Sequence, residues 1–255
     1  MTSEQRRICV GRINTTYYQS SSPLTGDVVL LLHGWGISGK TWLPLFEHIG
    51  DKYHTLAPDL PNFGDSDETP GPWGYEDYAH FVAEFLAQQG DSVQAHVIGH
   101  SMGGGIAAAF AALYPDVVKS LVLISPAGVP LSKVQHVAFT RIAEVSVQLA
   151  QSGFRFNQFS FLNTFLDNVI KRPNNMLQTM QFPASEDVRP LLPSVKAPCT
   201  VLWGKDDKLL PVTLAPDFQA GIPHATLQVI EGAGHEWCLI YPEQLAQVLN
   251  VSIRA

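Results

Sequence analysis

The sequence is short of cysteine, of basic residues and of long apolar runs, and each shortage excludes a class of protein. Its 3 cysteines (Cys9, Cys199 and Cys238) are an odd number without the close spacing of metal or redox motifs. This predicts free thiols in a reducing compartment, the cytoplasm. No apolar run reaches the roughly 18 residues of a membrane span. The polar N-terminus lacks the apolar segment of a signal peptide.

Basic residues are outnumbered, with 16 against 23 acidic residues and a net charge of −7. This balance is unfavourable for broad binding to nucleic acid or anionic lipid, so we expect a small molecule as the partner. With 255 residues and 45% hydrophobic content, the chain can form one large domain, or a domain with an insertion, around a sizeable core. The oligomeric state is left open.

Short apolar stretches rich in β-branched residues alternate with longer helical patterns. We expect strands over residues 7–10, 13–19, 28–32, 53–58, 93–98, 117–124, 199–203 and 226–230. We expect helices over residues 40–48, 75–88, 104–114, 211–220 and 242–251. This alternation predicts an α/β fold with a mostly parallel central sheet covered by helices on both faces.

The alternation stops between residues 126 and 190. This segment is expected to form a helical cap inserted into a core made of residues 1–125 and 191–255, above the sheet edge where ligands bind. Its seven phenylalanines either form the core of the cap or line an apolar pocket: Phe139, Phe154, Phe156, Phe159, Phe161, Phe165 and Phe182. The segment has a slight excess of basic residues, which we interpret as a solvated face rather than a docking site for an acidic partner.

The segment Gly99-His-Ser101-Met-Gly103 fits the pattern G-x-S-x-G. It stands between an expected strand and an expected helix, which is the setting of a nucleophile elbow. The turn leaves no space for side chains two residues before or after the serine. Ser101 is therefore the candidate nucleophile, and the amide of Met102 can face an oxyanion. The alternative is that Ser101 only caps the helix.

A serine hydroxyl needs an adjacent base. His235 follows the expected strand 226–230 on a glycine-rich loop, whereas His100 is too constrained within the elbow to reach Ser101. The acid is expected from the loop after strand 199–203, where Asp207 is favoured and Asp206 is the second choice. The order Ser, Asp, His along the chain is that of α/β-hydrolases.

The stretch His33-Gly34-Trp35-Gly36 follows the expected strand 28–32. Glycines let the backbone turn sharply and approach a ligand closely. The amide of Trp35 is the expected second donor of an oxyanion hole, beside that of Met102.

The same stretch also fits a competing pattern. Gly34, Gly36 and Gly39 form G-x-G-x-x-G, and Asp59 lies 20 residues further on, as in dinucleotide-binding proteins. We disfavour this alternative because Pro58 directly precedes Asp59 and because it leaves the serine, aspartate and histidine loops unexplained.

These motifs together resemble the α/β-hydrolase superfamily, and within it the small, cap-bearing serine carboxylesterases. The resemblance rests on five segments in the family's order: His33-Gly34-Trp35-Gly36, Asp59-Leu-Pro-Asn-Phe-Gly64-Asp-Ser66, Gly99-His-Ser101-Met-Gly103-Gly104, Gly204-Lys-Asp-Asp207 and Gly232-Ala-Gly-His235. It implies hydrolysis of small to medium apolar esters through an acyl-enzyme, with neither metal nor organic cofactor. Asn62 stands where the family usually has glycine. Glu236 stands where an apolar residue is common, and we expect its side chain to point to water.

Two alternatives stay open within this fold. The same triad could hydrolyse carbon–carbon bonds or lactones, although His100 is less typical of carbon–carbon hydrolases than asparagine. A receptor that binds a ligand without turnover belongs to a different class. Candidate substrate-binding residues are Gly34, Phe139, Phe159 and Trp237.

Overall fold

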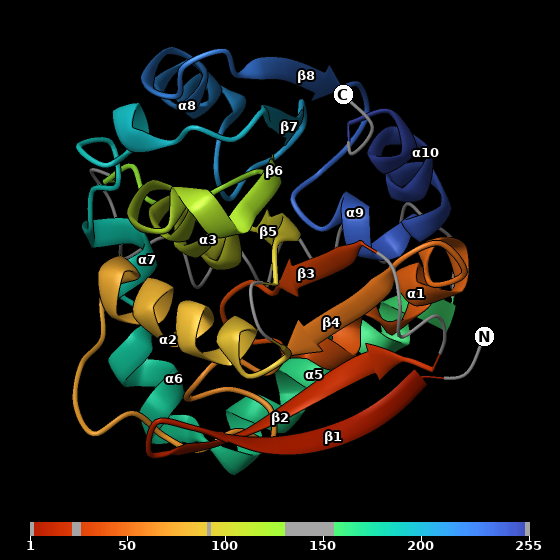
Figure 1. Ribbon diagram of the computed structural model, residues 1–255, viewed down its shortest axis with the longest axis vertical. Helices are drawn as coiled ribbons and strands as arrows, with labels where there is room; N and C mark the ends of the chain where they lie inside the picture. Colours follow the sequence, from red (N-terminus) through yellow and green to blue (C-terminus); the bar gives the residue numbers. More distant parts are fainter. Residues whose placement is uncertain (1–2, 22–26, 91–92, 131–155, 253–255) are drawn as a thin grey trace.

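The computed structural model describes residues 3–21, 27–90, 93–130 and 156–252. The described strands form one sheet of 8 strands in the order β1-β2-β4-β3-β5-β6-β7-β8 (Figure 1). They are β1 (Ser3–Val10), β2 (Ile13–Ser20), β3 (Val28–Leu32), β4 (His54–Pro58), β5 (Ala95–His100), β6 (Val118–Ile124), β7 (Cys199–Gly204) and β8 (Thr226–Ile230). Only the pairings β1–β2 and β2–β4 are antiparallel.

Helices cover both faces of the sheet, with α3 and α8 on one side and α1 and α10 on the other (Figure 1). Their bounds are α1 (Leu43–Ile49), α2 (Tyr75–Ala87), α3 (Met102–Leu113), α5 (Phe156–Lys171), α6 (Pro173–Thr179), α7 (Phe182–Ser185), α8 (Ala215–Gly221), α9 (Trp237–Ile240) and α10 (Pro242–Ser252). Short 3₁₀ turns are η1 (Gly39–Trp42), η2 (Pro115–Val117), η4 (Leu192–Ser194) and η5 (Val212–Leu214). The predicted fold class is confirmed.

The central strand β3 shows why the sheet needs both layers. Its sequence is Val-Val-Leu-Leu-Leu, and every residue is buried. Successive side chains of a strand point to opposite faces. Leu30 and Leu32 accordingly belong to the apolar cluster that contains residues of α2, α3 and α8, whereas Val29 and Leu31 belong to the cluster that contains residues of α1, α9 and α10.

The strand order also determines where a site can form. Strand β3 lies between β4 and β5, so the chain leaves β3 toward one side of the sheet and leaves β5 toward the other. Loops that diverge at the carboxyl ends of neighbouring parallel strands leave a crevice between them. The loop after β3 and the turn after β5 flank this point.

Several element boundaries differ from the sequence prediction; for example, α1 begins at Leu43 rather than residue 40, and α8 begins at Ala215 rather than residue 211. Strand β1 begins at Ser3 rather than residue 7, because its polar residues pair along β2 from Ser3 opposite Ser20 to Val10 opposite Ile13. Helix α3 begins at Met102 rather than residue 104, in spite of its three consecutive glycines. The turn between β5 and α3 is therefore one residue long.

In the described part of the predicted cap segment, after residue 155, lie three helices, namely α5, α6 and α7, which we call the insertion helices. Helix α5 contacts α6, α9 and η1, so it packs on the core. Phe139 lies outside the described residues, and the side chain of Phe159 in α5 is likewise outside them. Among the helices of the described residues, none combines the length and the apolar character needed to cross a membrane.

Candidate active site

Ser101 is the single residue between β5 and α3. Its φ of 57° and ψ of −120° lie outside the regions that ordinary residues favour. Such strain costs on the order of 1–3 kcal/mol and persists only where surrounding structure enforces it. Here the Ser101 amide donates to the Ile124 carbonyl at 3.0 Å, and the Ser101 carbonyl accepts from Gly104 and Ala127. The backbone of the serine is thus held by the end of β6, by the loop that follows β6 and by the first turn of α3.

The two glycines of the elbow are required by backbone contacts. A Cβ at Gly99 would lie 2.2 Å from the carbonyl oxygen of Gly103, and one at Gly103 would lie 2.3 Å from that of Leu32. Gly34 approaches the same turn, since a Cβ there would lie 3.2 Å from the Ser101 Cβ. The expectation that this turn leaves no space for side chains is confirmed.

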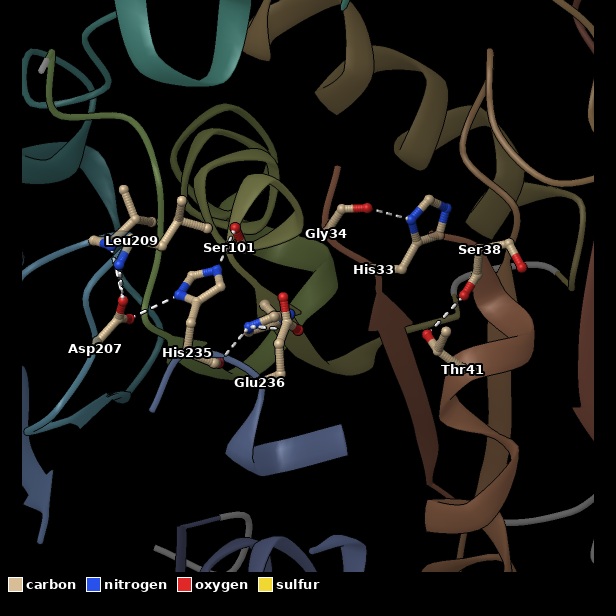
Figure 2. Close-up of polar contacts among 11 residues, drawn as sticks. His33, Gly34, Ser38, Thr41, Ser101, Asp207, Leu209, His235 and Glu236 are labelled. Atoms are coloured by element: carbon tan, nitrogen blue, oxygen red, sulfur yellow. Dashed lines mark hydrogen bonds and ion pairs between the residues drawn. The ribbon is translucent and has the colours of Figure 1, made fainter. Parts of the chain in front are cut away.

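The structure brings Ser101, His235 and Asp207 into one hydrogen-bonded chain (Figure 2). The Ser101 Oγ lies 2.9 Å from His235 Nε2, and His235 Nδ1 lies 2.7 Å from Asp207 Oδ2. A carboxylate only accepts hydrogen bonds. His235 therefore carries its proton on Nδ1 and leaves Nε2 free to accept the serine proton.

Asp207, rather than the neighbouring Asp206, reaches the histidine. Its Oδ1 accepts hydrogen bonds from the amides of Leu209 at 2.9 Å and Leu210 at 2.7 Å, which orient the carboxylate. Asp207 is buried, whereas Asp206 is exposed. The hydrogen-bonded chain has the geometry of the serine, histidine and aspartate triads that carry out acyl transfer.

The loop after β3 lies against the elbow, as predicted for an oxyanion hole. Figure 2 shows His33 and Gly34 on this loop, across from Ser101. His33 Nδ1 donates to the Gly34 carbonyl at 2.8 Å, while His33 Nε2 accepts from the Leu60 amide at 2.9 Å. Complete burial lowers the pKa of His33 to about 4. A neutral His33 with one donor and one acceptor therefore braces the segment that carries Trp35.

Asp59 has a structural task that accounts for the glycine-rich fingerprint. Its Oδ1 accepts from the Gly39 amide at 2.8 Å, and its Oδ2 accepts from the Asp65 amide at 2.9 Å. A Cβ at Gly39 would lie 2.3 Å from the Ala57 carbonyl oxygen. The carboxylate is fully buried, and burial raises its pKa to about 7. Both of its oxygens are engaged by backbone amides, so it does not reach a ribose.

The expectation that Glu236 points to water is wrong. Glu236 is 2% exposed, and its Oε2 lies 3.9 Å from Nε2 of His100. The Glu236 carbonyl accepts from the amides of Leu239 and Ile240, and this turn of α9 packs into the core and carries the side chain inward. His100 Nε2 also donates to the His235 carbonyl at 3.0 Å, so it contacts the histidine loop rather than the Ser101 hydroxyl.

The other predicted site residues lie as follows. Met102 is buried as the first residue of α3, which puts its amide at a helix N-terminus beside Ser101. Trp35 is half-buried on the loop after β3. Trp237, 2% exposed, packs in the same apolar cluster as Phe161 of α5. Whether Gly34, Trp35, Met102 or Trp237 contacts a substrate remains a prediction.

Asn62 takes the left-handed conformation for which relatives of this fold were expected to use glycine. Its φ is 78°. Asparagine tolerates this region better than most residues. The Asn62 Oδ1 accepts from the Thr69 amide at 2.9 Å, and Nδ2 donates to the Tyr78 hydroxyl at 3.2 Å. These contacts hold the loop that contains Gly64 against α2.

One contributor near the site was missed from the sequence. Asn168 of α5 is 3% exposed and hydrogen-bonds to the loop that carries Trp35. An asparagine among exposed positions of a helix gives no sequence signal of such a contact. For metals, the described residues contain no cluster of three or more histidine, cysteine or acidic side chains that could hold an ion.

Comparison with known proteins places the chain in a family. The sequence profile of the alpha/beta hydrolase family matches residues 29–248. The chain therefore belongs to the alpha/beta hydrolase family, as the motifs indicated.

Its relatives are hydrolases of several kinds. The chain is 29% identical over 239 residues to 2-hydroxy-6-oxo-6-phenylhexa-2,4-dienoate hydrolase of Burkholderia cepacia, which covers 82% of each protein. It is 27% identical over 238 residues to the pimeloyl-[acyl-carrier protein] methyl ester esterase of Aliivibrio salmonicida, covering 86% of this chain and 88% of the esterase. The structure of a bacterial membrane phospholipase A superposes with a TM-score of 0.84 and 26% identity, over 99% of this chain and 86% of the phospholipase.

Proposed function

We propose that this protein hydrolyses carboxylic esters of small to medium apolar substrates through an acyl-enzyme on Ser101. The observation that carries the proposal is the chain of hydrogen bonds from Ser101 through His235 to Asp207, at 2.9 and 2.7 Å. Its position at the carboxyl edge of the sheet, next to the loop after β3, gives further support, because ligands bind at this edge in open α/β sheets.

The chemistry follows from the positions of the protons. Ser101 Oγ attacks the ester carbonyl while His235 Nε2 takes its proton, and Asp207 stabilises the resulting imidazolium. The amides of Trp35 and Met102 are the proposed donors to the tetrahedral oxyanion. His235 then protonates the leaving alcohol, and water activated by the same histidine releases the acid.

An apolar substrate is supported by aromatic side chains beside the loop after β3. The Trp35 and Phe165 rings meet edge to face, with centroids 6.2 Å apart. Phe161 of the same helix is 5% exposed. We include residues 126–190 in the proposal as a cap over the substrate. A cytoplasmic location is supported by the three free cysteines.

The test is hydrolysis of p-nitrophenyl esters from acetyl to lauroyl. Ser101→Ala should lower kcat by at least about 10⁴-fold. Ser194→Ala, which changes an exposed serine, should leave turnover unchanged. Turnover that survives Ser101→Ala would contradict the proposal. The preferred chain length would give the size of the acyl pocket.

A second candidate function is carbon–carbon bond hydrolysis, which is favoured by the similarity to the dienoate hydrolase of Burkholderia cepacia. The two functions are separated by comparing kcat/KM for the best p-nitrophenyl ester with that for 2-hydroxy-6-oxo-6-phenylhexa-2,4-dienoate. A preference for the dienoate that disappears in Ser101→Ala would replace the esterase assignment.

A further inference from the structure

Asn168 is a buried amide on a helix whose neighbouring positions face outward. It is 3% exposed, while Leu166, Val169 and Ile170 of the same helix are 44%, 40% and 75% exposed. Burying an amide is unfavourable unless its hydrogen-bonding groups find partners. The burial of the Asn168 amide therefore implies hydrogen-bond partners beneath α5.

Those contacts join three separate segments. Asn168 Nδ2 donates to the Gly36 carbonyl at 3.2 Å and to the Thr164 carbonyl at 3.1 Å. Asn168 Oδ1 accepts from the Gly64 amide at 2.9 Å. One side chain thus links an insertion helix to the loop after β3 and to the loop after β4. An amide side chain supplies both the donors and the acceptor that these contacts need.

Other contacts hold the same loop beneath the insertion helices. The Trp35 indole Nε1 donates to the Thr179 hydroxyl of α6 at 3.0 Å. Gly36 has a φ of 79°, and a Cβ there would lie 3.0 Å from Met176 Cε and from the ring of Phe165. Helices α5 and α6 therefore lie directly on the loop at the two positions that follow Gly34.

We propose that Asn168 is a positioning residue for the oxyanion hole, which it holds in place by tying insertion helix α5 to the loop that carries the Trp35 amide. This inference rests on the proposed function. Gly36 directly follows Trp35, and its carbonyl lies two peptide groups after the Trp35 amide. A shift of this carbonyl therefore changes the course of the short loop that orients the amide expected to face the oxyanion. Thr179 acts on the same loop through the Trp35 side chain. The position of the insertion helices then sets the rate of the chemical step.

The experiment measures the rate at which a fluorophosphonate labels Ser101 in the full-length chain. Ser101 Oγ attacks phosphorus, the P–F bond breaks, fluoride leaves and His235 takes the serine proton. This reaction needs the nucleophile, the base and the oxyanion donors, but not the natural substrate. The variants are Asn168→Leu, Asn168→Asp and Thr179→Val. Asn163→Leu, at an exposed position of the same helix, is the matched control.

Asn168→Leu should slow labelling by about 10- to 100-fold, less than the 10²–10³-fold loss that follows removal of a whole oxyanion donor. Asn168→Asp should have a similar effect because it places an oxygen against the Gly36 carbonyl. Thr179→Val should slow labelling about 3- to 10-fold, the effect of one neutral hydrogen bond. On a p-nitrophenyl ester, kcat should fall in parallel while KM stays within about twofold. Asn163→Leu should match the wild type.

A merely structural role predicts something else. The Asn168 variants would then unfold at lower temperature, yet the folded protein would label at the wild-type rate, and that result would overturn the proposal. If Asn168→Leu does not fold, wild-type labelling rates in both Asn168→Asp and Thr179→Val overturn it equally. Rapid labelling of a wild type that hydrolyses no ester would refute the esterase function while still deciding the role of Asn168. A wild type that is not labelled at all refutes both.

Discussion

The two walls of the candidate site are held by different kinds of contact. On the sheet side, backbone lies against backbone, so that a Cβ at Gly103 would lie 2.3 Å from the Leu32 carbonyl oxygen. On the insertion side, the contacts are made by side chains, with Asn168 reaching Gly36 and Thr179 reaching Trp35. Backbone contacts leave no space for adjustment, whereas a single neutral hydrogen bond contributes only about 0.5–1.5 kcal/mol. The comparison teaches that backbone packing fixes the position of Ser101, while the position of the opposite wall depends on a few side-chain hydrogen bonds.

On the sheet side of the site, the largest effect is expected from a substitution of Asp207, the proposed acid. In Asp207→Asn, the remaining oxygen would keep the Leu209 and Leu210 amides, so the new NH₂ group would face His235. The histidine would then carry its proton on Nε2 and could no longer accept one from Ser101. We expect kcat on a p-nitrophenyl ester to fall about 10⁴-fold. The adjacent Asp206→Asn, at an exposed position, should have no effect, and the reverse pattern would show that the acid is misassigned.

The second large effect is expected at Gly103 of the elbow, where a substitution should lower the stability of the fold. Gly103→Ala would place a methyl group against the backbone carbonyls of Leu32 and His33. We expect the free energy of unfolding to fall by at least about 3 kcal/mol, measured by urea denaturation. Gly71→Ala adds a methyl group in open space and is the matched control. Equal stability of the two variants would contradict the close packing of the elbow.

His33, on the loop after β3, should make the stability of the protein depend on pH. His33 has a pKa of about 4 in the folded protein and an ordinary value of 6.5 when unfolded. The unfolded chain therefore binds the extra proton between these values, and stability is lost as the pH falls from 6.5 to 4. We expect the stability advantage of the wild type over His33→Asn to shrink by about 3 kcal/mol over this range. Asp59 titrates in both proteins and cancels from the difference. An advantage that is constant with pH would show that His33 is not held neutral.

The smallest effect is expected on the outer face of the insertion helices. Ile170 is 75% exposed. Ile170→Ser should change the free energy of unfolding by no more than about 0.5 kcal/mol and leave ester hydrolysis unchanged. A large loss of activity would show that the outer face of α5, and not only the face that carries Asn168, contributes to the reaction.

The sequence predicts the sheet well because strands buried on both faces are continuous apolar runs, as in Val28–Leu32. It underestimates β1 because an edge strand with exposed polar residues has no apolar pattern, and its first residues are fixed by pairing with β2. Helix α3 was placed two residues late because glycines disfavour helices. There the backbone contacts of the elbow outweigh the intrinsic preference.

The site residues that directly follow parallel strands could be predicted from the sequence. Ser101, Asp207 and His235 each follow a parallel strand, and such strands end at the same edge of a sheet. Asn168 and Glu236 could not be predicted in this way. Asn168 binds to backbone groups of two glycines, which leave no complementary side chain in the sequence. Glu236 is buried by the packing of α9, which no local pattern reveals.

Strand β8 has a consequence for how this protein gains and loses its chemistry. It lies at the edge of the sheet, pairs with β7 alone among the described strands, and is largely exposed or half-buried. The loop after it carries His235, 134 residues beyond Ser101. Edge elements open at lower free energy than central strands.

On heating, ester hydrolysis should therefore be lost at a lower temperature than the ellipticity of the protein. If activity and ellipticity fall together, this expectation is contradicted. A chain in which β8 has not docked lacks the contact between His235 and Ser101, so we expect it to be inactive even if the Ser101 turn has formed. Hydrolytic activity would therefore report whether β8 has docked at the edge of the sheet.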